Sequence, residues 1–260
     1  MNFTHLHCHT HFSLLDGLTK IDPLVLRAKE LGMEALAMTD HGAMHGAIEF
    51  YNRCREEGIK PIIGMEAYVA PRRLLDKEGK TDSDYFHLTL LAKDDQGYKN
   101  LIKLTTIAHL EGFYYKPRID LELLKKYSLG LIALSGCQRG EIPRAAAHKS
   151  ETEAQKVLEK YLEIFGTENF FIELQRIAKQ GEEKAKEESL NERLVVLAKR
   201  NNLGLVATSD CHYIYPEDSE AQDVLVCIGT ARTVNDTDRL DMRGFDLSFK
   251  SAEQMRELFF

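Results

Sequence analysis

Short apolar segments alternate with longer amphipathic segments along most of the 260-residue chain. The short segments have the length of β-strands, and the longer ones carry apolar residues at helical spacing. Strands separated by helices indicate a mainly parallel sheet, because a helix returns the chain between parallel strands. About seven such units favour a barrel over an open sheet, and the chemistry of such barrels lies at the C-terminal ends of the strands.

The pattern predicts strands at 4–9, 35–39, 61–69, 86–92, 129–134, 170–174 and 205–209. It predicts helices at 23–31, 45–57, 95–110, 152–165, 182–201 and 217–228. The polar segment 72–84 is expected to be an exposed loop. Ser251 and Gln254 predict the capped start of a further helix. Because that helix ends on apolar residues, we expect the chain to be an N-terminal fragment of a longer protein. Its last roughly 30 residues could then begin a linker to the next domain.

The composition, with 43% hydrophobic residues, is typical of a soluble globular domain. The apolar runs fall far short of the about 20 residues of a membrane span, and the start lacks the parts of a signal peptide. The five cysteines form no CxxC pair, which argues against a disulfide framework or a structural zinc site. We therefore expect a cytoplasmic protein with reduced thiols and no membrane partner.

The formal net charge of −7 disfavours nonspecific binding to nucleic acid, because that affinity comes from lysine and arginine. Bound divalent cations could nevertheless reverse the electric field inside one cleft. The acidity is therefore compatible with a phosphate substrate, provided that metal ions help to bind it.

Alternate residues near the start of the chain are histidines: His5, His7, His9 and His11. Alternate residues of a strand share one face, so these imidazoles could point to the same side. Imidazole is a common ligand for zinc, manganese or iron. A polar strand face would explain one pair of histidines, whereas the whole run followed by Asp16 favours a metal site.

Two further segments place polar side chains on predicted strands or at their ends. Asp40 and His41 follow the apolar run ALAM, although a helix-capping aspartate would explain Asp40 equally well. Glu66 lies inside the apolar segment PIIGMEAYV, and buried carboxylates are rare unless they are paired or bind a metal. His87 opens the run HLTLLA, and the same argument applies to it with less force.

The remaining candidates follow two later strands. Cys137 comes after GLIALSG; a buried structural cysteine is the alternative, and Pro143 breaks the CxxxxxR spacing of a phosphatase nucleophile. Asp210 and His212 form a DxH pair that suits half of a metal site. The candidate ligands that should converge at one mouth of the barrel are His7, His9, Asp16, His41, Glu66, His87, Cys137, Asp210 and His212.

These motifs resemble the PHP (polymerase and histidinol phosphatase) family, and within it the N-terminal domain of bacterial DNA polymerase III alpha subunits. The resemblance covers nearly the whole chain and rests on HLHCHTHFSLLDG, ALAMTDHGAMHGAIEFY, KPIIGMEAYVA, HLTLLAKDDQGYKNLIKL, GLIALSGCQRGEIPRA and LVATSDCHYI. It implies a distorted (β/α)7 barrel, a single PHP domain over residues 1–260, and about two or three divalent zinc, manganese or iron ions.

The resemblance also implies how the ligands are shared among the ions. One ion would be held by His7, His9, Glu66 and Asp210. Glu66 would bridge to a second ion held with His87 and Cys137. A third ion would be held by Asp16, His41 and His212. Glu66, Asp16 and Asp210 would be the catalytic carboxylates. His11 is not counted, because relatives often carry Glu or Gln there, and His5 and His109 could only support the ligands.

The reaction implied by the resemblance is hydrolysis of DNA phosphodiesters by a metal-activated water, with 3′–5′ removal of nucleotides. Arg118 and Arg139 could bind phosphate, although surface solvation explains each equally well. The implied partners are DNA at a primer 3′ end, the remainder of a polymerase chain and other replicase subunits. The alternatives are a histidinol-phosphatase-like monoesterase, a structural metal-binding polymerase domain without turnover, and a metal-binding regulatory module without turnover. The polymerase-type motifs count against the first, and the full ligand set counts against the second.

Overall fold

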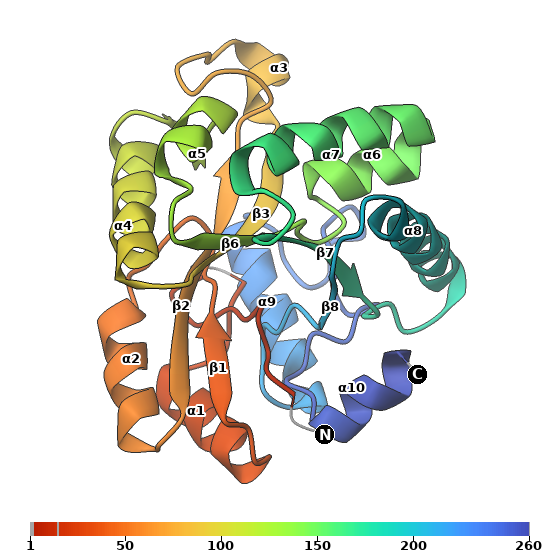
Figure 1. Cartoon of the computed structure of the whole chain (residues 1–260). Coiled ribbons are helices and arrows are strands. Elements are labelled where there is room, and N and C mark those ends of the chain that lie inside the picture. Colours follow the sequence, from red (N-terminus) through yellow and green to blue (C-terminus); the bar gives the residue numbers. More distant parts are fainter. Residues whose placement is uncertain (1–2, 15, 260) are drawn as a thin grey trace.

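The structure, a computed structural model, describes residues 3–14 and 16–259 (Figure 1). A curled sheet lies at its centre, with strand order β4-β5-β2-β3-β6-β7-β8 and with β1 paired to β2. The strands are β1 Ala35–Met38, β2 Lys60–Val69, β3 Phe86–Ala92, β4 Phe113–Tyr114, β5 Lys116–Ile119, β6 Leu131–Leu134, β7 Phe170–Gln175 and β8 Leu205–Thr208. The predicted α/β class is confirmed, and the sheet curls into a partial barrel.

Helices surround the sheet, and the predicted ones are all present to within two residues at each end. The helices are α1 Ile21–Glu30, α2 Ala47–Glu56, α3 Gly79–Ser83, α4 Asp95–Leu110, α5 Leu121–Tyr127, α6 Glu141–His148, α7 Glu151–Phe165, α8 Gly181–Arg200, α9 Ser219–Gly229 and α10 Ala252–Phe259. A short 3₁₀ turn, η1, spans Pro216–Asp218. Helices α1 and α2 lie beside β1 and β2, whereas α7 and α8 pack against β6 and β7 (Figure 1).

The prediction of a strand at 4–9 was wrong. Only Cys8 forms a bridge, parallel to Cys211. The segment is still held on both sides, because the N–H of Ala37 donates to the carbonyl of His5 at 3.0 Å and the N–H of His9 donates to the carbonyl of Cys211 at 2.8 Å. A regular ladder does not develop, since the chain turns away at residues 11–14. The segment therefore lies between β1 and the residues that follow β8.

Strand β3 runs antiparallel to both of its neighbours, β2 and β6. The pairs β1–β2, β2–β5, β6–β7 and β7–β8 are parallel, as expected for most of the sheet. The reversal of β3 places its first residues beside the last residues of β2, with His87 opposite Tyr68. His87 therefore lies at the same mouth of the sheet as residues that follow the other strands.

Several short elements were not predicted. The segment 72–84 is largely exposed, as expected, but it is not a loop throughout. That segment contains α3 and the buried Asp82. The Asp82 carboxylate is satisfied in its buried position, since it accepts hydrogen bonds from Arg72 at 2.9 and 2.5 Å and from the N–H of Glu78 at 2.8 Å. Helix α6 contains Pro143 in its first turn, where the missing N–H breaks no helical hydrogen bond. The hairpin β4–β5 and helix α5 also escaped prediction.

The capped start of the last helix is confirmed. The hydroxyl of Ser251 accepts a hydrogen bond from the N–H of Gln254 at 3.2 Å, and Oε1 of Gln254 accepts from the N–H of Ser251 at 2.7 Å. Leu247 and Phe249, just before this helix, are buried. Over residues 3–14 and 16–259, no helix is long and apolar enough to cross a membrane.

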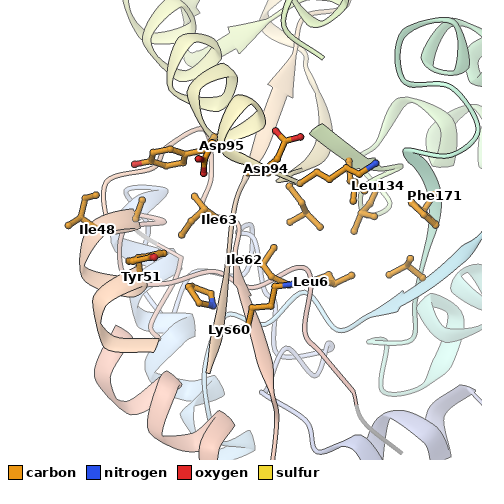
Figure 2. A pocket seen from close by; sticks show the side chains of 18 residues that line it. Leu6, Ile48, Tyr51, Lys60, Ile62, Ile63, Asp94, Asp95, Leu134 and Phe171 are labelled. Atoms are coloured by element: carbon orange, nitrogen blue, oxygen red, sulfur yellow. The ribbon is translucent and has the colours of Figure 1, made fainter. Parts of the chain in front are cut away.

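A cavity of about 760 Å³ opens at the end of the sheet where β2, β6, β7 and β8 begin (Figure 2). Its wall is largely apolar and includes Leu6, Ile62, Leu134 and Phe171. The predicted ligands do not line this cavity. The chemistry-bearing residues are thus confined to the opposite mouth.

Candidate metal centre

The predicted ligands gather at one mouth of the partial barrel, although they come from distant parts of the chain. His7 and His9 come from the N-terminal segment and Asp16 from the turn after it. Three further elements supply His41 after β1, Glu66 in β2 and His87 in β3. Cys137 follows β6, and Asp210 and His212 follow β8. Most ligands therefore lie at or beyond C-terminal strand ends, and the reversal of β3 brings His87 to the same place.

Glu66 lies at the centre of the cluster and is buried. Its Oε1 atom is 2.7 Å from Nδ1 of His87 and 3.3 Å from Nε2 of His7. The Sγ atom of Cys137 is 3.8 Å from the same oxygen. The other oxygen, Oε2, is 2.5 Å from Nδ1 of His41. The two oxygens of this carboxylate therefore face different sets of donor atoms. A carboxylate that bridges two metal ions would have the same placement.

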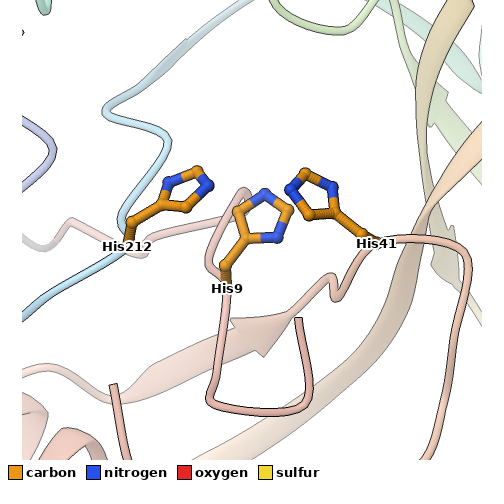
Figure 3. Close-up of side chains that lie close together, drawn as sticks. All are labelled: His9, His41 and His212. Carbon is orange, nitrogen blue, oxygen red and sulfur yellow. The ribbon is translucent and has the colours of Figure 1, made fainter. Parts of the chain in front are cut away.

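The donor atoms form three groups, and within each group the atoms lie no more than 4.8 Å apart. They are Glu66 with His87 and Cys137; His7 with His9 and Glu66; and His9 with His41 and His212 (Figure 3). In the third group His9 stands where the resemblance implied Asp16. Asp16 is close by, with its Oδ2 atom 2.9 Å from Nε2 of His41.

Two buried carboxylate oxygens in the cluster accept no hydrogen bond of good geometry among the described residues: Oδ1 of Asp16 and Oδ1 of Asp210. The second of these oxygens does lie 3.2 Å from Nε2 of His9 and 3.3 Å from Nε2 of His7. A buried oxygen without a partner is costly, so it calls for an ion or another group that the protein itself does not supply. Asp210 also has a φ of +48°, an uncommon value for a residue with a side chain and one that often occurs at functional sites. The imidazole, carboxylate and thiol donors together fit divalent transition-metal ions.

The electrostatics favour the metal-binding form of some of these side chains and the protonated form of others. Burial lowers the pKa of His9 to about 3, and the neighbouring imidazoles of His41 and His212 act in the same direction. Burial by itself would raise the pKa of Asp16, but the charge of His41 lowers it to about 2. A neutral imidazole and an ionised carboxylate are the forms that coordinate a metal ion.

Two other candidate ligands favour their protonated forms. Burial alone would lower the pKa of His41, but the charges of Asp16 and Glu66 raise it to about 10. Burial raises the pKa of the Cys137 thiol. A metal ion would therefore have to displace those protons.

Residues 5–177 match the family model described as PHP domain. The chain belongs to the PHP domain family. This PHP chain is 45% identical over 260 residues to DNA polymerase III subunit alpha of Treponema pallidum (strain Nichols), covering 100% of the chain and 22% of that relative. It is 46% identical over 262 residues to the same subunit of Thermus aquaticus, covering 99% of the chain and 21% of the relative. The chain thus spans about a fifth of the length of these relatives, and the resemblance inferred from the motifs is confirmed.

Solved structures share the fold at low sequence identity. A protein from Bifidobacterium adolescentis, assigned as a metal-dependent phosphoesterase, matches with a TM-score of 0.50 at 16% identity, over 81% of the PHP chain and 88% of its own. An amidohydrolase from Chromobacterium violaceum matches with a TM-score of 0.50 at 15% identity, over 80% and 87% respectively. At these identities the likeness concerns the fold alone.

A further buried carboxylate of the PHP domain, Glu173 in β7, escaped the sequence analysis. Its Oε1 atom lies 2.7 Å from Nδ1 of His7 and accepts hydrogen bonds from Thr208 at 2.6 Å and from Gln175 at 3.1 Å. The signal was available, because Glu173 interrupts the apolar run FFIELQ just as Glu66 interrupts its own strand. The rule that selected Glu66 applies equally to Glu173.

His5 and His109, the two histidines expected to support the ligands, lie outside the three donor groups. Nε2 of His5 lies 2.8 Å from the carbonyl of Lys250, and its Nδ1 is 3.2 Å from the hydroxyl of Ser209. His109 contacts the carbonyl of Gly42 at 3.0 Å through Nε2, and so supports the loop that carries His41. These histidines hold the backbone near the ligands.

The structure contradicts the expected phosphate contact of Arg118. This side chain is fully buried and donates hydrogen bonds to the carbonyls of Asp82 at 2.6 Å and Asp76 at 3.0 Å. Its guanidinium donates to backbone carbonyls and is inaccessible to a phosphate. Arg139, in contrast, is exposed and lies 5.1 Å from the centre of the Tyr85 ring.

A pocket of about 480 Å³ gives access to the cluster. One wall carries Tyr68, Tyr85, Lys116 and Arg139, in addition to several of the ligands. The opposite wall is mainly apolar and comes from α9 and the residues after it, including Val226, Leu240, Met242 and Phe245. The pocket therefore joins a polar metal-ligand cluster to a surface that can hold an organic part of a substrate.

Proposed function

We propose that this PHP domain hydrolyses phosphodiesters of DNA and removes nucleotides in the 3′–5′ direction. The observation that carries the proposal is that seven of the predicted ligands line one pocket, while His7 and His9 are buried against Glu66 and Asp210 of that group. The choice of DNA is supported by the relatives, which are DNA polymerase III alpha subunits.

About two or three divalent ions would be held by the three donor groups, and they would supply a nucleophilic water at neutral pH and neutralise charge on the phosphate. Glu66 sets the spacing of the donors on its two sides, since each oxygen faces a different group. Asp16 and Asp210 contribute negative charge, and each has one buried oxygen that accepts no hydrogen bond of good geometry from the described residues. Arg139 is placed on the pocket wall, where it can orient a phosphate without being a ligand.

A structural metal site without turnover is supported less well. Structural sites are usually closed by protein ligands, whereas catalytic ones remain open to substrate. The side chains of Asp16 and His41 remain 34% and 15% exposed, and both line the pocket. That access is what turnover requires.

The direct test is hydrolysis of a single-stranded oligonucleotide labelled at its 5′ end, with added manganese or zinc. The proposal predicts a ladder of products shortened from the 3′ end, loss of activity with chelator, and no activity in Asp210→Asn. Release of phosphate from histidinol phosphate, with no shortening of DNA, would show that the domain is a monoesterase instead. Absence of both activities in metal-loaded protein would favour a structural role.

We further propose that residues 1–260 form a single domain of a longer polymerase chain, which works at a primer 3′ end with other replicase subunits. The length of the relatives supports the longer chain, and the burial of Leu247 and Phe249 supports inclusion of the last described residues. Limited proteolysis can test the single domain. Cleavage in the exposed segment 230–238 should leave two pieces that remain associated, whereas separate pieces would place a boundary there.

A further inference from the structure

The hairpin β4–β5 carries aromatic side chains that are exposed to solvent. The side chains of Phe113 and Tyr115 are exposed, at 53% and 69%. Tyr115 joins the two strands with a φ of +61°, a strained value for a bulky residue. Such strain persists only where the surrounding structure imposes it, and it is often found at binding sites. The ring of Tyr115 packs edge-on against Tyr114 at a centroid distance of 4.7 Å, and its remaining surface, like that of Phe113, is open to a ligand.

The hairpin is fixed against the mouth of the pocket. Its second strand pairs with the end of β2, with Arg118 opposite Tyr68. Pro117 packs so closely on Gly42, next to His41, that a Cβ at Gly42 would lie 2.8 Å from the proline ring. Lys116 lines the pocket, and its Nζ atom is 5.4 Å from the centre of the Tyr68 ring. The buried guanidinium of Arg118 holds the base of the hairpin, so the exposed rings stand on a rigid support.

A second cation stands on the same wall of the pocket. Arg139 lies over the ring of Tyr85, which is nearly parallel to His87 at a centroid distance of 5.8 Å. The loop of Arg139 is tied to β3, because its carbonyl accepts the N–H of His87 at 3.1 Å. Lys116 and Arg139 both line the pocket, and each cation lies over an aromatic ring. Two cations at the pocket suit a ligand with more than one phosphate.

We propose that Phe113, Tyr115, Lys116 and Arg139 form a surface that binds an unpaired nucleic-acid strand and leads it into the metal centre. Unpaired bases can stack on exposed aromatic rings, and the phosphates between them are attracted by neighbouring cations. In a duplex the bases are stacked on one another and cannot reach the rings, so the surface selects single-stranded ends. The inference rests on the proposed function, whose substrate it narrows to a frayed or single-stranded end.

Binding can be measured by fluorescence anisotropy on metal-loaded protein, with a labelled single-stranded oligonucleotide whose linkages resist hydrolysis, so that cleavage does not contribute. The wild type should bind the single strand more tightly than a duplex of the same sequence. Tyr115→Gly should weaken binding by about tenfold, because it removes one stacking ring. Glycine also accepts the positive φ, so the melting temperature should not fall. Tyr115→Phe keeps the ring and should bind like the wild type.

A matched control is Tyr51→Ala. Tyr51 is 47% exposed on α2 and lines the cavity at the opposite end of the sheet. Its removal should leave oligonucleotide affinity unchanged. The salt dependence separates the two kinds of contact: Lys116→Gln and Arg139→Gln should each reduce the slope of log affinity against log salt by about 0.7, whereas Tyr115→Gly should leave the slope unchanged.

Equal affinity for duplex and single strand, or wild-type binding by Tyr115→Gly, would overturn the inference. The hydrolysis assay distinguishes a failure of the strand-binding surface from a failure of the proposed reaction. If the metal-loaded wild type shortens DNA while Tyr115→Gly binds and cleaves normally, only the strand-binding surface is wrong. If no DNA is cleaved but the binding pattern holds, the proposed reaction fails and the strand-binding surface stands.

Discussion

The Nδ1 atom of His7 lies 2.7 Å from Oε1 of Glu173, on the side of the ring that faces away from the ligand cluster. This contact directs the Nε2 atom of His7 toward Glu66 and Asp210, each at 3.3 Å. Carboxylates that accept the second ring N–H of a metal-binding histidine fix its tautomer and raise its basicity. Glu173 thus positions His7, a candidate ligand, and is not itself in any of the donor groups.

Glu173→Gln should therefore weaken metal binding by about 10–100-fold, because the amide keeps the shape of the side chain but loses its charge. Competition with a chelating dye would measure the affinity. Glu187→Gln is a suitable control: Glu187 is also buried, but its carboxylate accepts from the backbone N–H groups of Ile177 and Ala178. Equal affinities in the wild type and Glu173→Gln would show that the contact serves only folding.

Asp16→Asn should lose one bound ion and most of the hydrolytic rate. The change removes the negative charge beside His41, 2.9 Å away, while keeping the shape of the turn. The melting temperature should fall by only a few degrees, because the sheet and the other ligands are untouched. Metal content and rate should be measured on the same preparation. If Asp16 only shapes the turn, asparagine replaces it well and both values stay at those of the wild type.

Arg118→Met should destabilise the fold rather than weaken DNA binding. It leaves several buried carbonyls without their donor, and each such loss costs about 1–3 kcal/mol of the free energy of unfolding. Urea denaturation would measure the change. Exposed Arg139→Gln should alter the free energy of unfolding by no more than about 0.5 kcal/mol. A stable Arg118→Met protein with weakened DNA affinity would restore Arg118 to the phosphate-binding residues.

The sequence contained enough information to locate six strands and the six longer predicted helices, because apolar periodicity reports burial. It also singled out polar side chains that the fold brings together, because polar residues inside apolar runs are conspicuous. It did not reveal the direction of β3, since periodicity is the same for parallel and antiparallel strands. It also misplaced Arg118: a buried arginine depends on carbonyls from residues 74, 76, 82 and 112, which only the folded chain brings together.

The metal content of protein purified without chelator tests the central claim most directly. Wild-type protein and Glu66→Gln should be analysed side by side by elemental analysis, with their folding checked by circular dichroism. We predict about two or three transition-metal ions per wild-type chain. Glu66→Gln should hold fewer, because Glu66 contributes to two of the three donor groups. A reproducible count of zero in the folded wild type, or an unchanged count in Glu66→Gln, would contradict the account.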